Sequence, residues 1–146
     1  MFEGISDSNK LVFFDLEARR KLKLGVDLLF AAVSVTMGPK GNNVAIERAG
    51  ATPILTKDGV TVASAVNLKD RVPNLGVQMV KEAAARTADT AGDGTTTATV
   101  LAHAIFEEGM RQLAAGASSV DLKKGIDLAT DKVIQHIMSE TIPVTS

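Results

Sequence analysis

The stretch "AGDGTTT", residues 91–97, combines residue types that could hold a phosphate group and a metal ion. Where a helix begins, unpaired backbone N–H groups and the positive end of the helix dipole attract phosphate oxygens without any basic side chain. Gly92 and Gly94 would let the backbone approach a ligand closely, and Asp93 between them is suited to a hard cation beside those oxygens. Three hydroxyl donors follow directly: Thr95, Thr96 and Thr97.

An ordinary helix start is the alternative explanation of this stretch. Aspartate and threonine are common N-caps, and glycine before them is usual in loops. The triple threonine favours the phosphate site, because β-branched residues are mediocre helix formers and a cap needs only one of them. The "GK[ST]" ending of a Walker loop is missing and no strand precedes the stretch, which argues against a kinase or GTPase of the P-loop class.

Two more glycine-containing loops, "TMGPKG" (36–41) and "TKDGV" (56–60), also fall at the ends of regular elements. Each has a simple local explanation. The first is a proline–glycine helix stop with Lys40 as a solvated charge, and the second is a turn in which Lys57 and Asp58 are merely polar. Ligands commonly bind at such element ends, and the order and spacing of the three loops together indicate one ligand site.

A helix and a hairpin are predicted before the third loop. Residues 15–35 place four apolar side chains on one helical face, which predicts a helix that stops at "TMGPKG". These side chains are Leu22, Val26, Leu29 and Val33. The β-prone runs "NNVAIE" and "TPILT", separated by "RAGA", predict a hairpin. "KDGV" predicts a turn after it, and "KLVFF" near the start of the chain predicts a further short strand.

Two helices are predicted on either side of "AGDGT". The first starts near Pro73 and runs through an alanine-rich segment to Ala91. Its larger side chains at helical spacing are Leu75 and Met79, followed by Ala83. The second begins after "AGDGT" and ends by "EEGM" or "LAAGA". Its expected apolar face consists of Val100, Leu101, Ala104 and Ile105.

A last helix is predicted after Ser118, with Asp121 in its first turn and Pro143 as its end. Its apolar residues recur at helical spacing. They are Leu122, Ile126, Ala129, Val133 and Ile137. The predicted fold is therefore mainly α, with one hairpin and one short N-terminal strand.

Composition and charge exclude several classes of function. The 146 residues are 45% apolar and carry a net charge of −1, with basic residues scattered among acids. One domain or a piece of one, and no nucleic-acid partner, are therefore expected. There is no cysteine for disulfides or thiolate chemistry, and His103 and His136 are expected to be structural, on a helix surface or in the core. No signal peptide or membrane span is apparent, which predicts a cytoplasmic protein with no membrane partner.

The three loops in this order, with the helices between them, resemble the chaperonin family, specifically the group I, sixty-kilodalton type. Three segments carry the resemblance: "VTMGPKGNNVAIE", "ATPILTKDGVTVA" and "VKEAAARTADTAGDGTTTATVLAHAIFEEGMRQLAAGASSVDLKKGID". The similarity is almost continuous from about Lys10 to Pro143. The occurrence of "DGTTTATVLA" after "TKDGV" is highly specific, and "TKDG" with lysine and aspartate favours group I over the archaeal and eukaryotic cytosolic type.

The resemblance implies an ATP-driven protein-folding machine, built as a ring of subunits that each have an equatorial, an intermediate and an apical domain. The chain resembles the N-terminal half of the equatorial domain, a multihelical fold with a short N-terminal strand and one hairpin. On this basis residues 1–9 are a flexible leader and residues 10–140 are the N-terminal part of the ATP-binding equatorial domain. Residues 141–146 would then begin the connection to an intermediate domain that this chain lacks.

The resemblance also assigns nucleotide contacts to the first two loops. The backbone of the first loop packs against the nucleotide on its α-phosphate side through Thr36, Met37, Gly38 and Pro39. Leucine is usual in the family where this chain has Met37, a conservative exchange at a backbone contact. By the same resemblance Lys57 would lie near the phosphates and a monovalent cation, K+, and Asp58 would help to position the attacking water.

The third loop carries the metal and the outer phosphates. By resemblance Asp93 coordinates Mg2+, and the helix start cradles the β- and γ-phosphates of ATP, or the phosphates of ADP, through Gly94, Thr95, Thr96 and Thr97. The general-base aspartate of the family, its adenine- and ribose-binding residues and its apical domain all correspond to positions beyond residue 146. Weak nucleotide binding and negligible hydrolysis are therefore expected of this chain by itself.

Assembly is implied by the strands. In the family the N-terminal strand, here "KLVFF", pairs with the hairpin of a neighbouring subunit, so a homo-oligomeric ring is expected. Unfolded client proteins and a co-chaperonin are further expected partners of the intact protein. Asn42 replaces the arginine usual in the family and residues 1–9 are extra, which favours a divergent member such as an accessory or virus-encoded copy. The alternative is a helical assembly module that has lost nucleotide use, against which the retained Asp93 argues.

Overall fold

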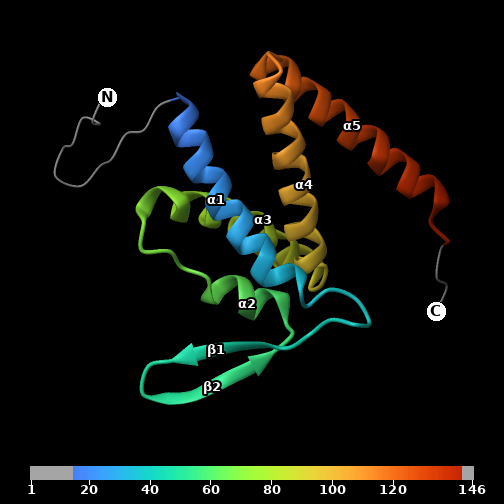
Figure 1. Cartoon of the computed structure of the whole chain (residues 1–146). Coiled ribbons are helices and arrows are strands. Elements are labelled where there is room, and N and C mark those ends of the chain that lie inside the picture. The colour runs from blue at the N-terminus through green and yellow to red at the C-terminus, as the bar shows by residue number, and fades with distance from the viewer. Residues whose placement is uncertain (1–14, 143–146) are drawn as a thin grey trace. The chain divides into compact units, whose positions relative to one another are not determined.

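The computed structural model describes residues 15–142, which form five helices and one hairpin (Figure 1). The elements are α1 (Asp15–Ser34), β1 (Val44–Arg48), β2 (Ala51–Thr56), α2 (Gly59–Ala65), α3 (Arg71–Ala91), α4 (Thr95–Ala114) and α5 (Ser119–Glu140). The chain divides into two compact units, one up to Ile105 and one from Phe106, and the division falls within α4. The mainly α class with one hairpin is confirmed. The expected "KLVFF" strand lies outside the described residues.

The core of the first unit forms where α1 packs on α3. The predicted face of α1 is buried at Val26, Leu29 and Val33, which are at most 2% exposed, while Leu22 is half-buried. The side of α3 that is buried with it contains Val72, Val77 and Val80. Burial of a valine or leucine contributes about 1.5–3 kcal/mol, so this contact is the main source of hydrophobic stabilisation in the unit.

Glycine brings the backbones of α1 and α3 into direct contact. A Cβ atom added to Gly25 of α1 would lie 1.8 Å from the carbonyl oxygen of Pro73 in α3. The contact is reciprocal, since a Cβ on Gly76 of α3 would lie 2.2 Å from the carbonyl oxygen of Leu22 in α1. Only residues without a side chain permit this approach, so the two glycines set the distance between the helices.

The hairpin is antiparallel, as predicted, and pairs Val44 with Thr56 and Ile46 with Ile54. An irregularity follows Ile46, and Gly50 adopts a positive φ of 70° in the connecting turn. Leu55 is 72% exposed, so the hairpin presents apolar surface among the described residues.

The turn predicted at "KDGV" is instead the start of a helix, α2, and the prediction was wrong there. Asp58 is its N-cap and accepts hydrogen bonds from the backbone of Val60 and Thr61. A good cap can start a helix in a sequence of weak helix formers such as "GVTVASA", because it satisfies backbone donors that would otherwise be unpaired. The residue types of "KDGV" by themselves predict a turn.

The predicted apolar face of α4 was also wrong. Leu101 and Ile105 are 56% and 50% exposed, whereas Thr95 and Thr99 are buried. The Thr99 hydroxyl donates to the carbonyl oxygen of Thr95 at 3.0 Å. Because that bond satisfies the hydroxyl internally, threonine occupies the buried side, and a count of apolar residues misplaces the face. On α3, similarly, Leu75 and Met79 lie on the exposed side.

The second unit contains the end of α4 and the helix α5. Ser118 stands at the N-cap position of α5 and Asp121 in its first turn, as predicted, although the Ser118 side chain makes no capping hydrogen bond. None of the residues of α5 is buried; Leu122 packs near Gly109 of α4, while Val133 is 56% exposed. The helix is confirmed, but the described residues do not cover its apolar face. Across residues 15–142, every helix is too short or too polar to cross a lipid bilayer.

Candidate functional site

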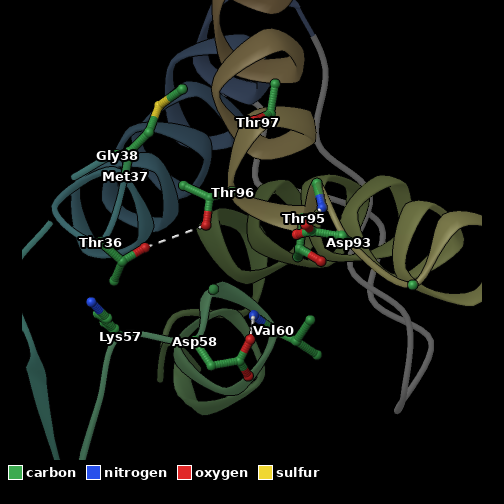
Figure 2. Close-up of a pocket in the computed structure, with 13 residues that line it drawn as sticks. Thr36, Met37, Gly38, Lys57, Asp58, Val60, Asp93, Thr95, Thr96 and Thr97 are labelled. Atoms are coloured by element: carbon green, nitrogen blue, oxygen red, sulfur yellow. Dashed lines mark hydrogen bonds between the residues drawn. The ribbon is translucent and has the colours of Figure 1, made fainter.

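The three glycine-containing loops meet in the first unit around a cavity of about 420 Å³ (Figure 2). One wall is the segment after α1, a second is the link from β2 to α2, and the third is the start of α4. The lining residues are Thr36, Met37, Gly38, Lys57, Asp58, Gly59, Val60, Gly92, Asp93, Gly94, Thr95, Thr96 and Thr97. All residues that the sequence assigned to the site line this cavity except Pro39, which is not part of the wall. Gly59 and Val60 line it without having been assigned to it.

The start of α4 presents unpaired backbone amides to the cavity. Gly92 and Gly94 have positive φ values of 71° and 89°, a conformation that glycine adopts without a side-chain clash. The first helical hydrogen bond of α4 runs from the amide of Ala98 to the carbonyl oxygen of Gly94 at 2.8 Å. The amides before it, those of Thr95, Thr96 and Thr97, have no acceptor within residues 15–142. Such a helix start favours an anion.

Asp93 is exposed at the mouth of the cavity, and its Oδ1 accepts a hydrogen bond from the amide of Gly94 at 2.6 Å. No cluster of three or more metal-ligating side chains occurs in the described part of the chain. Mg2+ typically takes one or two carboxylates and fills its other positions with water and phosphate oxygens. Asp93 therefore fits a magnesium ion that arrives with a phosphate ligand, and does not fit a preformed all-protein metal site.

Asp58 lines the cavity while its carboxylate caps α2. Its Oδ2 accepts hydrogen bonds from the Thr61 hydroxyl at 2.5 Å and from the Thr61 amide at 2.8 Å. These bonds, the hydroxyl bond first, outweigh the effect of partial burial and lower the pKa of Asp58 below its ordinary value. The contact of Oδ1 with the Val60 amide is longer, at 3.4 Å, so this oxygen can still accept a hydrogen from a ligand or water.

We expect the Asp58 cap to weaken in acid. A carboxylate whose pKa is lowered by folding stabilises the protein above its unfolded pKa of about 3.9, and this contribution is lost as pH falls through the folded pKa. Asp58→Ala should lower the free energy of unfolding by about 1 kcal/mol at neutral pH. The loss should shrink progressively below about pH 4, because the carboxyl is protonated first in the unfolded chain and, at lower pH, also in the folded protein. Urea unfolding at several pH values checks this, with Asp89→Ala on exposed α3 surface as the control. A loss that does not change with pH would contradict it.

Lys57 contributes positive charge to the cavity. Its side chain is exposed, and within residues 15–142 it forms no ion pair with any acid. The ammonium group is therefore available to a phosphate oxygen. Lys40 of the first loop, by contrast, is not among the lining residues.

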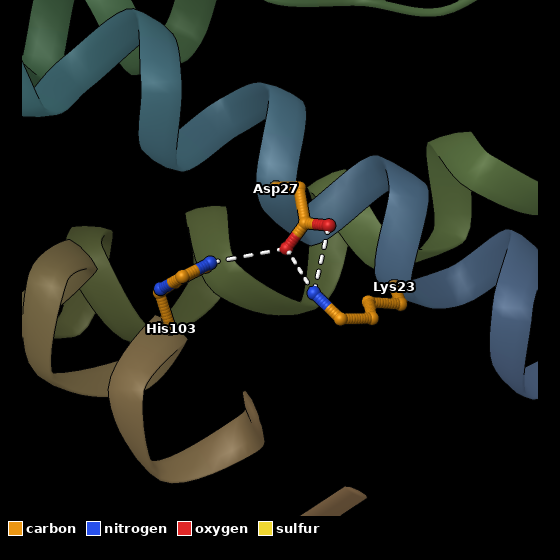
Figure 3. A network of polar contacts seen from close by, with 3 residues as sticks. All are labelled: Lys23, Asp27 and His103. Atoms are coloured by element: carbon orange, nitrogen blue, oxygen red, sulfur yellow. Dashed lines mark hydrogen bonds and ion pairs between the residues drawn. The ribbon is translucent and has the colours of Figure 1, made fainter. Parts of the chain in front are cut away.

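A polar network that the sequence did not indicate joins α1 to α4 (Figure 3). The Asp27 carboxylate binds the Lys23 ammonium at 2.8 Å and His103 Nε2 at 3.0 Å, and the His103 ring stacks on Phe30 with ring centres 3.9 Å apart. Partial burial raises the pKa of Asp27, but the hydrogen bonds from Lys23 and His103 outweigh it and leave the pKa lowered. His103 is thus a structural histidine, as expected, and it lies about two turns of α4 beyond Thr96.

The fold and the site together define a class of protein. Residues 29–146 match the TCP-1/cpn60 chaperonin family, which is most of the chain, so the chain belongs to that family. The predicted identity as a fragment of a chaperonin equatorial domain is confirmed. The assignment to group I in particular stays a prediction.

Solved structures of chaperonins have the same fold. The chaperonin gp146 from the bacteriophage EL 2 (Pseudomonas aeruginosa), crystallised in the presence of ATP-BeFx, is 31% identical with a TM-score of 0.78, over 94% of this chain and 24% of that one. Its second crystal form gives 31% identity and a TM-score of 0.77 over the same shares of the two chains. A group III chaperonin in the open state is 28% identical with a TM-score of 0.76, over 88% of this chain and 25% of that one. The chain spans about a quarter of the length of these proteins.

Proposed function

We propose that this chain supplies the phosphate- and magnesium-binding part of the ATP site of a chaperonin subunit. The observation that carries the proposal is the cavity at which the three loops meet, with the unpaired amides of α4 at one wall. The phage chaperonin with the same fold was crystallised in the presence of an ATP analogue, ATP-BeFx, which supports a nucleotide as the ligand.

Phosphate oxygens would bind at the start of α4. The amides of Thr95, Thr96 and Thr97 would donate to them, and the glycines at 92 and 94 leave room for the approach. Asp93 would hold Mg2+ on the solvent side of the phosphates, and Lys57 would offset part of their charge. When bound, Mg2+ neutralises and orients the phosphate chain. The backbone of residues 36–38 would contact the nucleotide from the opposite wall.

Hydrolysis would also need groups outside residues 1–146. Asp58 lines the cavity and keeps one oxygen able to accept a hydrogen from water, which suits a role in positioning the attacking water. The family resemblance assigns the general base and the adenine contacts to positions beyond residue 146. Residues 1–146 alone should therefore bind the phosphate end of a nucleotide weakly and turn it over negligibly. In the intact protein we expect an ATPase that drives protein folding, with K+ at the site and a ring assembled through the hairpin.

The test compares ligands that share or lack phosphate groups. In calorimetric titrations with Mg2+ and K+ present, ATP and inorganic triphosphate should bind with similar affinity. ADP should bind more weakly, and adenosine should show no binding. The similarity of the first two is expected because the wall consists mainly of backbone, hydroxyl and charged groups, which recognise phosphate and not a base. Adenosine binding as tight as that of ATP, or no binding of ATP and triphosphate at millimolar concentration, would contradict the proposal.

A helical assembly module without nucleotide use is the second candidate. The observation that favours it is exposed apolar surface, including Leu55 on the hairpin at 72% and Ile137 on α5 at 56%. Sedimentation of the chain with and without ATP separates the two candidates. Self-association together with no nucleotide binding would support the module and argue against the ATP site.

A further inference from the structure

We propose that the side chain of Thr36 is a positioning residue that fixes the hydroxyl of Thr96 at the start of α4. The inference rests on the proposed function for its effect on ligand binding, but its geometric part stands on the ligand-free protein. It gives the Thr36 hydroxyl a role separate from that of the Thr36 backbone, and it states which way the Thr96 hydroxyl points.

The Thr36 hydroxyl already uses its only hydrogen. The side chain is 7% exposed, and its Oγ1 donates to the carbonyl oxygen of Val33 at 2.7 Å. The same Oγ1 lies 3.3 Å from Oγ1 of Thr96. Since Thr36 has no second hydrogen to give, Thr96 must be the donor in that contact. Figure 2 shows the two hydroxyls facing one another across the cavity wall.

The hydrogen of the Thr96 hydroxyl is therefore directed at Thr36 and not at a ligand in the cavity. Thr96 then serves a phosphate ligand through its amide, while its hydroxyl presents lone pairs and not a hydrogen. This differs from the expectation that all three threonine hydroxyls act as donors to phosphate.

Gly59 confines Thr96 from a second direction. A Cβ atom added to Gly59 would lie 2.3 Å from Oγ1 of Thr96 and 3.3 Å from its amide nitrogen. The Thr96 side chain thus stands between the Gly59 backbone and the Thr36 hydroxyl, one from each of the other two loops. All three loops are in contact at this one side chain. Its rotamer therefore depends on the relative positions of the loops and helps to fix them.

Two variants separate the hydroxyl from the shape of the side chain. Thr36→Val removes the acceptor for Thr96 and keeps the branched shape, whereas Thr36→Ser keeps the acceptor. In Thr36→Val the Thr96 side chain, and with it the start of α4, is no longer held in one position. Because a hydrogen bond contributes about 0.5–1.5 kcal/mol net, this loss of positioning should weaken binding of inorganic triphosphate with Mg2+ by about two- to tenfold, and stronger binding would overturn the proposal. Thr36→Ser should restore most of that binding.

The second measurement is the χ1 angle of Thr96, obtained from three-bond NMR couplings without ligand. We expect a single rotamer in the wild type and in Thr36→Ser, and a mixture in Thr36→Val. Gly59→Ala should also displace this rotamer. If Thr36→Val does not fold, Thr36→Ala removes the same hydroxyl with less bulk and takes its place.

The outcomes are decisive in each case. Weaker binding together with an altered χ1, both rescued by serine, upholds the proposal, and either effect without the other overturns it. If the wild type does not bind triphosphate at all, the proposed function fails by itself. The rotamer comparison then decides the role of Thr36, because an unchanged χ1 in Thr36→Val overturns it and a mixture upholds it.

Discussion

Replacing Gly25 by alanine is expected to lower the free energy of unfolding by about 3 kcal/mol, at the upper end of what overpacking a core usually costs. The added Cβ would stand 1.8 Å from the carbonyl oxygen of Pro73, 2.7 Å from its carbon and 3.1 Å from the amide nitrogen of Val77. All three atoms belong to the backbone of α3, so no side chain can move aside. The two helices would have to separate, and the valine contacts between them would loosen.

Gly125 provides the matched control. It too lies inside a helix, α5, but a Cβ there meets no atom within 4 Å. Gly125→Ala should therefore raise helix stability by about 0.5–1 kcal/mol, the usual benefit of removing a glycine from a helix interior. Gly76→Ala should lower the free energy of unfolding by a similar amount to Gly25→Ala, since its Cβ would lie 2.2 Å from the carbonyl oxygen of Leu22. Urea unfolding followed by circular dichroism measures all three, and equal stability of the Gly25 and Gly125 variants would rule out the close backbone contact.

Asp93→Asn is expected to abolish the enhancement of ATP or triphosphate binding by Mg2+. Asparagine retains an oxygen that can accept the hydrogen bond from Gly94, so the loop should keep its conformation. What is lost is the negative charge of the only acid in the third loop, and with it the proposed protein ligand for the cation. Interactions with charged groups contribute about 1.5–3 kcal/mol, which corresponds to about ten- to hundredfold weaker binding when Mg2+ is present.

Without Mg2+ the Asp93 variant should no longer bind triphosphate more weakly than the wild type. Removing a carboxylate from the neighbourhood of a polyanion reduces repulsion, so the variant should bind triphosphate in EDTA at least as well as the wild type does. Calorimetric titrations with and without Mg2+ measure this difference, and Asp89→Asn on α3 is the control for a simple loss of surface charge. If the Asp93 variant keeps the Mg2+ dependence of the wild type, the metal is held elsewhere.

The sequence predicted those features of the fold that are determined by residues close together in the chain. The spacing of apolar residues in α1, the turn between β1 and β2, and the glycines around Asp93 are all local signals, and the structure bears each of them out. The helix α2 was missed because one capping carboxylate outweighs a run of weak helix formers. The face of α4 was misjudged because buried threonine satisfies its own hydroxyl through the backbone.

Contacts between distant parts of the chain could not be predicted in the same way. Each loop of the site had an ordinary local explanation, and only their order, through the family resemblance, indicated one cavity. Pro39 was assigned with its neighbours through the family resemblance, whereas the cavity wall ends at Gly38. The close approach of Gly59 to Thr96 and the hydrogen bond between Asp27 and His103 each involve residues far apart in sequence. No rule based on sequence spacing could have predicted them.

The glycine contact between α1 and α3 also has a consequence for hydrogen exchange with D2O. Backbones that touch leave no room for water, so the amides of α1 and α3 near Gly25 and Gly76 should exchange only through opening of the whole unit. The amides of Thr95, Thr96 and Thr97 at the start of α4 have no acceptor among the described residues and should exchange faster. The same chain therefore contains slow amides as an internal reference and fast amides at the site, and ligand binding would be visible as selective slowing of the second group.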